Sequence, residues 1–153
     1  MVNNVADSNN DGVGEAGGAY AAGSFNLQNT IMAENTDLGG EAPNCFGTFT
    51  SYGYNLLGDD TGCTFNDTTG DQIGTGGSPI DPLIDVLADN SGNSFTHALL
   101  DGSPAIDGGN PSGCTDQTLA LLTTDQRGFA RAVDGNADSV SYTHLRAHET
   151  LNH

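Results

Sequence analysis

Lysine and tryptophan are absent from this 153-residue sequence, and only three arginines stand against twenty acidic residues. The resulting net charge of −17 repels phosphate backbones, so we expect no nucleic acid partner. No apolar run approaches the roughly 20 residues of a membrane-spanning helix, and we therefore expect no membrane span. These shortages exclude nucleic acids and the bilayer interior as the chain's working environment.

Glycine is abundant, with 22 residues, while only 35% of the chain is hydrophobic. Because glycine, asparagine and aspartate tolerate the backbone of tight turns, this composition predicts one all-β domain of many short strands. Residues 25–35 alternate apolar and polar side chains and predict one half-buried strand. Further short strands are predicted at residues 46–50, 53–57 and 63–65, and a loop at 68–77.

Residues 96–110, with the sequence THALLDGSPAIDGGN, are the segment on which the strands are predicted to close. Glycine and proline set the turns there, while Leu99, Leu100 and Ile106 are expected to be buried. His97 is interpreted as a residue packed against this segment rather than as a ligand. Arg127 is expected to have a structural role in so acidic a chain, with Asp107 as its proposed partner.

Oxygen-bearing side chains recur at alternate positions near the start, in Asp7, Asn9 and Asp11, and a glycine follows. This is the spacing of the first half of a calcium-binding loop. The second half does not fit, because the twelfth position is Gly18 rather than a bidentate glutamate. A polar β-turn has the same composition, so a calcium site and a simple turn both remain open.

The cysteines lack the CxxC or CxxH spacing of a zinc site. Cys45 and Cys63 flank a predicted strand pair, and a disulfide between them would close a loop of about 18 residues and stabilise it by roughly 3 kcal/mol. Such a bond implies an oxidising compartment. Cys114 is then left over.

Several phrases occur in an order that carries a family resemblance. They are NTIMAEN (29–35), GYNLLG (53–58), DPL (81–83), LADN (87–90), THALL (96–100), GSPAID (102–107) and DQRG (125–128). Together they resemble the C-terminal part of bacterial secreted or surface proteins of the pectate-lyase-like superfamily that carry a choice-of-anchor Q domain. The resemblance implies a right-handed parallel β-helix, with its last few coils in residues 1–95 and an irregular C-terminal cap in residues 96–138.

The same resemblance bears on both ends of the chain. It implies further coils of the same β-helix upstream, as a packing partner, and a cysteine-containing ending after DQRG that would pair with Cys114. Residues 139–153 instead resemble a translated adapter or vector sequence, and we expect a non-native, disordered tail there. A metal-binding pair formed by His144 and His148 is rejected for that reason.

Function follows less directly than fold. The resemblance favours a non-catalytic structural or adhesive module, secreted or on the cell surface, with polysaccharide or cell-surface components as partners. Calcium, suggested by the spacing of Asp7, Asn9 and Asp11, is the one cofactor for which the sequence gives a signal. The alternative is part of a polysaccharide lyase or glycosidase whose active site lies mostly outside these residues. The adjacent Asp59 and Asp60 do not favour it, because neighbouring residues of an extended strand face opposite sides.

Overall fold

A computed structural model describes residues 1–116, 118 and 120–131, and the described residues form short strands and no helix. The all-β class expected from the composition is thereby confirmed. The described part of the chain also holds no helix with the length and hydrophobicity that a membrane crossing requires. The strands are β1 (Val5–Ala6), β2 (Ala19–Leu27), β3 (Ile31–Met32), β4 (Thr36–Asp37), β5 (Cys45–Ser51), β6 (Leu56–Leu57), β7 (Cys63–Asn66) and β8 (Gln72–Ile73).

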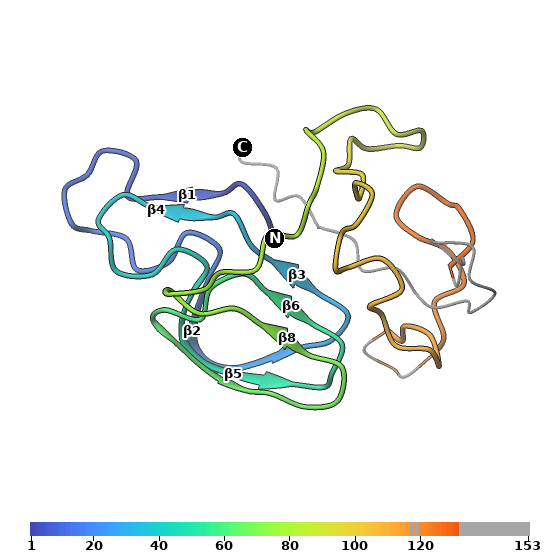
Figure 1. The fold of residues 1–153 in the computed structure, drawn as a ribbon, viewed down its shortest axis with the longest axis horizontal. Coiled ribbons are helices and arrows are strands. Elements are labelled where there is room, and N and C mark those ends of the chain that lie inside the picture. The colour runs from blue at the N-terminus through green and yellow to red at the C-terminus, as the bar shows by residue number, and fades with distance from the viewer. Residues whose placement is uncertain (117, 119, 132–153) are drawn as a thin grey trace.

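Every named strand pair in the described residues is parallel, and each pair joins corresponding parts of successive turns of the chain (Figure 1). One sheet has the order β2-β5-β7, a second has the order β3-β6-β8, and β1 pairs with β4. Strands that follow one another in sequence, such as β5 and β6, therefore belong to different sheets. The chain repeatedly turns a corner between sheets and returns beside its previous strand.

Corresponding side chains of successive strands form continuous rows between the two larger sheets. The register aligns Phe49 of β5 with Phe25 and Phe65, and the ring centroids lie 5.2 and 6.5 Å from that of Phe49. Opposite them, Met32 of β3 and Leu57 of β6 are buried in the same cluster. Phe49 is fully buried, so this cluster supplies a core that runs from one strand to the next.

The other face of the β3-β6-β8 sheet is covered by the C-terminal half of the chain. Ile31 and Leu56 point to this side and pack with Ala105, which is fully buried. Of the side chains predicted to be buried in residues 96–110, Leu99 packs against this cluster, whereas Leu100 is 42% exposed. The small Ala105 occupies the core position because Ser103 and Pro104 bring the backbone close to the sheet: the Pro104 carbonyl accepts a hydrogen bond from a β8 side chain.

Three predicted elements are corrected by the structure: the strands at 25–35 and 53–57 and the loop at 68–77. Of residues 53–57 only Leu56–Leu57 form a strand, β6, because the backbone turns at Gly53 and Tyr54 with φ angles of +95° and +59°. Residues 25–35 are not one strand, because the backbone turns at Asn29 and Glu34, which have φ angles of +49° and +55°. Residues 68–77, predicted as a loop, contain the short strand β8. The predicted strands at 46–50 and 63–65 correspond to β5 and β7.

Candidate functional site

An open pocket of 290 Å³ lies beside the β3–β4 corner. Three carboxylates line it: Glu34 from the corner, Asp59 after β6 and Asp81 from the segment that covers the sheet. The Asn35 and Asn44 side chains lie at its inner wall. Residues remote in sequence therefore meet here, at the junction between the stacked strands and the C-terminal half.

Glu34 is the electrostatically unusual member of this pocket. Partial burial raises the pKa of its carboxyl above the ordinary value, and the charge of the nearby Asp81 raises that pKa further. His97 and a hydrogen bond with Asn3 lower it in part. His97 itself is buried, and its Nδ1 donates to the Asp85 carbonyl over 2.7 Å, which agrees with the packing role expected from the sequence. A carboxyl with a raised pKa can hold a proton in a pocket, as a general acid must.

Asparagine side chains form hydrogen bonds between successive turns of the chain. Asn35 donates to the Asn44 Oδ1 over 3.1 Å and accepts from Asn4, while Asn44 donates to the Asp59 carbonyl. At the opposite corner, Asn55 accepts from the Thr30 amide. Asparagine suits these corners because one amide both donates and accepts. These side chains therefore have structural partners.

The predicted calcium residues lie in one loop between β1 and β2. Asp7 is buried, and its carboxylate accepts the backbone amides of Asp11 and Gly12 over 2.9 and 3.0 Å. The Asn9 side chain donates to the Asp11 carboxylate over 2.7 Å. These bonds account for the three side chains as parts of a tight turn. Within the described residues, no three His, Cys, Asp or Glu side chains are grouped as a metal site would need.

A calcium ion in this loop remains a prediction that a melting experiment can test. If the loop binds calcium, EDTA lowers the melting temperature of the protein, and Asp11→Ala abolishes that effect. An EDTA-treated protein that melts at the same temperature as the calcium-loaded protein would leave only the turn.

Another acidic pair lies close to this loop, at β4. Burial raises the pKa of Asp37, but hydrogen bonds from the Ala42 amide, the Glu41 side chain and the Gly39 amide outweigh it and leave that pKa lowered. The hydrogen bond with Asp37 in turn raises the pKa of Glu41. Here too a carboxylate serves the backbone, because the Asp37 oxygens accept the amides of a tight turn.

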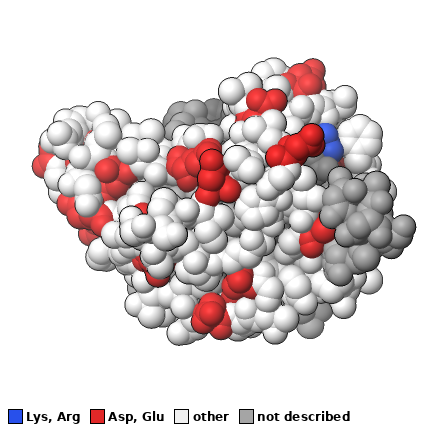
Figure 2. All heavy atoms as spheres, in the orientation of Figure 1, with Lys and Arg blue, Asp and Glu red and all other residues white. Residues whose placement is uncertain are grey.

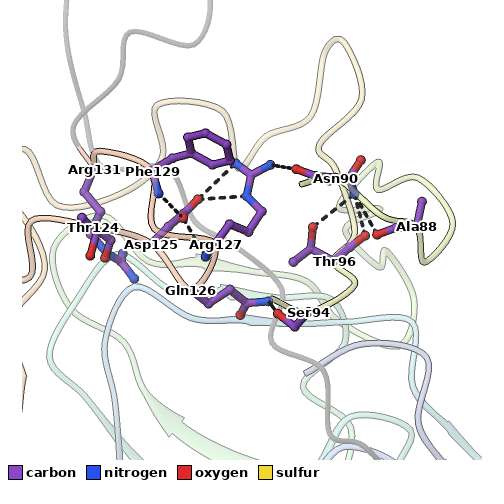
Figure 3. A network of polar contacts seen from close by, with 10 residues as sticks. All are labelled: Ala88, Asn90, Ser94, Thr96, Thr124, Asp125, Gln126, Arg127, Phe129 and Arg131. Atoms are coloured by element: carbon purple, nitrogen blue, oxygen red, sulfur yellow. Dashed lines mark hydrogen bonds and ion pairs between the residues drawn. The ribbon is translucent and has the colours of Figure 1, made fainter. Parts of the chain in front are cut away.

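Arg127 joins two loops of the C-terminal half (Figure 3). Its Nε and Nη2 each lie 3.1 Å from the same carboxylate oxygen of Asp125, and its Nη1 donates to the Asn90 carbonyl over 2.7 Å. The guanidinium also lies over the Phe129 ring, 4.8 Å from its centroid. The expected structural role of Arg127 is confirmed, but its ion pair is with Asp125 rather than with Asp107, because the DQRG turn brings the two side chains together locally.

The predicted disulfide between Cys45 and Cys63 is present, with 5.5 Å between the Cα atoms. It connects the start of β5 to the start of β7, so it clamps two neighbouring strands of one sheet. Cys114 is buried, and its sulfur accepts a hydrogen bond from Arg131 over 3.2 Å. The tail predicted at residues 139–153 lies outside the described residues.

Surface charge does not single out one site on the face shown in Figure 2. The acidic side chains lie there in several separate groups, and the visible basic side chain lies directly beside acidic ones. Comparison with known proteins adds no assignment. A scan of protein families, a search of curated proteins and a search of solved structures each found nothing that matches this chain.

Proposed function

We propose that this chain is the terminal part of a right-handed parallel β-helix and serves as a non-catalytic structural or adhesive module of a secreted or cell-surface protein. The observation that carries the proposal is the stacking of aligned rows in parallel sheets, above all the phenylalanine row through Phe49. In such an architecture each turn buries an apolar row against the previous turn, so the core extends by repetition.

The way polar groups are used supports a structural role. The carboxylates of Asp7, Asp37 and Asp125 accept backbone amides within turns, and Asn35 and Asn55 connect neighbouring turns of the chain. Such groups satisfy the backbone at corners where no strand partner is available. The need for such acceptors in turns can therefore account for acidic side chains in this chain.

Residues 96–138 are proposed as the cap of this β-helix, and the described part supports that assignment in two ways. Ala105 fills a core position on the β3-β6 face, and Arg127 ties the loop at 124–130 to the loop that contains Asn90. A covering segment is physically needed, because stacked strands expose apolar faces and unpaired backbone groups at their ends.

The Cys45–Cys63 disulfide supports an extracellular location, because such bonds persist in oxidising compartments. The test is alkylation of the protein isolated from its native host, with and without reductant. We expect alkylation at Cys45 and Cys63 only after reduction. Alkylation of both residues without reductant would contradict this part of the proposal.

A second candidate is glycoside hydrolysis in the 290 Å³ pocket, favoured by the raised pKa of Glu34 beside Asp81. In that case Glu34 would protonate the leaving oxygen, and a second carboxylate would act on the sugar carbon or on a water molecule. One test serves both this candidate and the structural proposal: the protein is incubated with neutral and acidic polysaccharides, and new reducing ends and unsaturated uronates are measured. We expect no turnover above that of Glu34→Gln. Turnover that Glu34→Gln abolishes would refute the non-catalytic role.

A further inference from the structure

The strands of the β2-β5-β7 sheet carry no charged side chain on their outward face, although the chain as a whole is strongly acidic. The segments AYAAGSFNL, CFGTFTS and CTFN contain no Asp, Glu, Lys or Arg. Their outward positions carry hydroxyl, amide and aromatic groups instead. We call this outward face of β2, β5 and β7 the strip. Its strands provide neither carboxylates to bind cations nor basic groups to bind anions, although the chain has a net charge of −17.

Two exposed aromatic rings form one end of this strip. Tyr20 of β2 and Phe46 of β5 are register partners, their ring centroids lie 6.0 Å apart, and the ring planes differ by only 16°. The rings remain 52% and 38% exposed, although they stack. Hydrogen bonding to Glu15 raises the pKa of the Tyr20 hydroxyl at the edge of this pair. The pair is thus an oriented apolar platform in contact with water.

Polar rows continue from this platform along the strands. Thr48 of β5 aligns with Thr64 of β7, and Thr50 aligns with Asn26 on one side and Asn66 on the other. All of these side chains are exposed. Alternate residues of a strand are about 6.6–6.8 Å apart and neighbouring strands about 4.8 Å apart, so the hydroxyl and amide groups form a regular array.

A shallow groove of 440 Å³ lies beside the polar rows and is lined by Thr48 and Thr50, Gly47 and residues 21–24. It arises where the register of β2 against β5 shifts between Ala21 and Phe25. Gly47 in its lining has a φ of +101°, and a Cβ there would collide with the Ala21 carbonyl, whereas a Cβ at Gly23 would meet only open space. The volume is within the range of about 300–1,000 Å³ that is usual for small-ligand sites.

We propose that this strip, through Tyr20, Phe46, Thr48, Thr50 and the groove beside them, binds a neutral polysaccharide chain. The C–H groups on the face of a sugar ring pack on exposed aromatic rings, while its hydroxyls exchange hydrogen bonds with threonine and asparagine. An acidic glycan is disfavoured because the strip offers no basic group. The proposal rests on the proposed function in one point: it names neutral polysaccharide as the partner of the adhesive role.

The test is titration calorimetry of the full chain with cellohexaose, xylohexaose, mannohexaose and, as the acidic probe, hexagalacturonate. We expect at least one neutral hexasaccharide to bind at millimolar concentration or below, and hexagalacturonate to bind more weakly. Phe46→Ala should weaken that binding about tenfold, because it removes one ring of the platform. Phe95→Ala is the matched control, since Phe95 is 56% exposed and belongs to the loop between the paired residues Ala88 and Thr96, outside the β2-β5-β7 sheet, and it should bind as the unaltered chain does.

Several results would overturn the proposal. They are no binding by any neutral probe, tighter binding of hexagalacturonate, or equal effects of Phe46→Ala and Phe95→Ala. Self-association that Phe46→Ala abolishes, without glycan binding, would assign the strip to contacts between copies of the chain. Thermal melts of each variant show whether the fold is kept. Because the architecture is tested by structure determination, loss of the glycan proposal leaves the structural proposal standing.

Discussion

Asn55 gives the sharpest test of how the turns of the chain are held together. It follows the corner before β6 and is only 2% exposed. Its Oδ1 accepts the Thr30 amide over 3.0 Å, and its Nδ2 lies within hydrogen-bond distance of the Leu27 carbonyl, the Ser51 hydroxyl and the Asp71 carboxylate. The side chain therefore connects strands of successive turns at one buried point.

Asn55→Ala removes all of these bonds and leaves the Thr30 amide without that acceptor. At about 1 kcal/mol for each hydrogen bond, and more where the partner is charged, we expect a loss of about 3–4 kcal/mol in the free energy of unfolding. Total stabilities are typically about 5–15 kcal/mol, so the loss is large. Urea unfolding followed by circular dichroism measures it, with a midpoint shift of about 1.5–2 M for a slope near 2 kcal/mol/M.

The matched control is Asn66→Ala, because Asn66 is an exposed asparagine on β7. It should change the stability by no more than about 0.5 kcal/mol. Asn55→Asp adds a second readout. Its carboxylate faces Asp71, so its deficit relative to the unaltered chain should shrink as the pH falls and position 55 is protonated. An Asn55→Ala variant as stable as Asn66→Ala would refute the reasoning.

Three further outcomes are expected. Arg127→Ala should lower the free energy of unfolding, measured by denaturant titration, by about 2 kcal/mol, because it leaves the buried Asp125 carboxylate without its cation. Arg131→Ala makes the same change of charge and should lower it by less than half as much. Equal losses for the two variants would contradict the specific pair. Reducing the Cys45–Cys63 disulfide should lower the stability by about 3 kcal/mol, and an unchanged unfolding midpoint would count against the clamp. Folding raises the pKa of Glu34, so the folded protein binds more protons than the unfolded chain, and its stability falls as the pH rises from 4.5 through that raised pKa. Glu34→Gln should therefore have a higher melting temperature than the unaltered chain at pH 7 but not at pH 4. A difference in melting temperature that does not depend on pH would exclude this cause.

Strand β5 could be predicted from the sequence because its alternation is clean. Phe49 points inward, while Phe46 and Thr48 point outward, which is the pattern of a strand with one buried face. The corner at Asn29 could not be located by alternation alone, since the apolar pattern of β2 continues into β3. The available signal was Asn29 itself, because asparagine adopts a positive φ more readily than most residues.

The pocket and the Arg127 contact illustrate a different limit. Glu34, Asp59 and Asp81 are separated by more than twenty residues each, and only the stacking of turns brings them to one pocket. Arg127 was expected to reach a distant acid, yet its partner Asp125 is two residues away. Short-range turn geometry decided this contact, and a pattern of charges along the sequence does not reveal it.

The most direct test of the account is a crystal structure of this chain that determines the winding of the turns. The account predicts right-handed winding, with Phe49 paired in parallel register with Phe25 and Phe65 and Leu57 with Met32 and Ile73. Left-handed winding, or antiparallel pairing of β5 with β2 or β7, would contradict it.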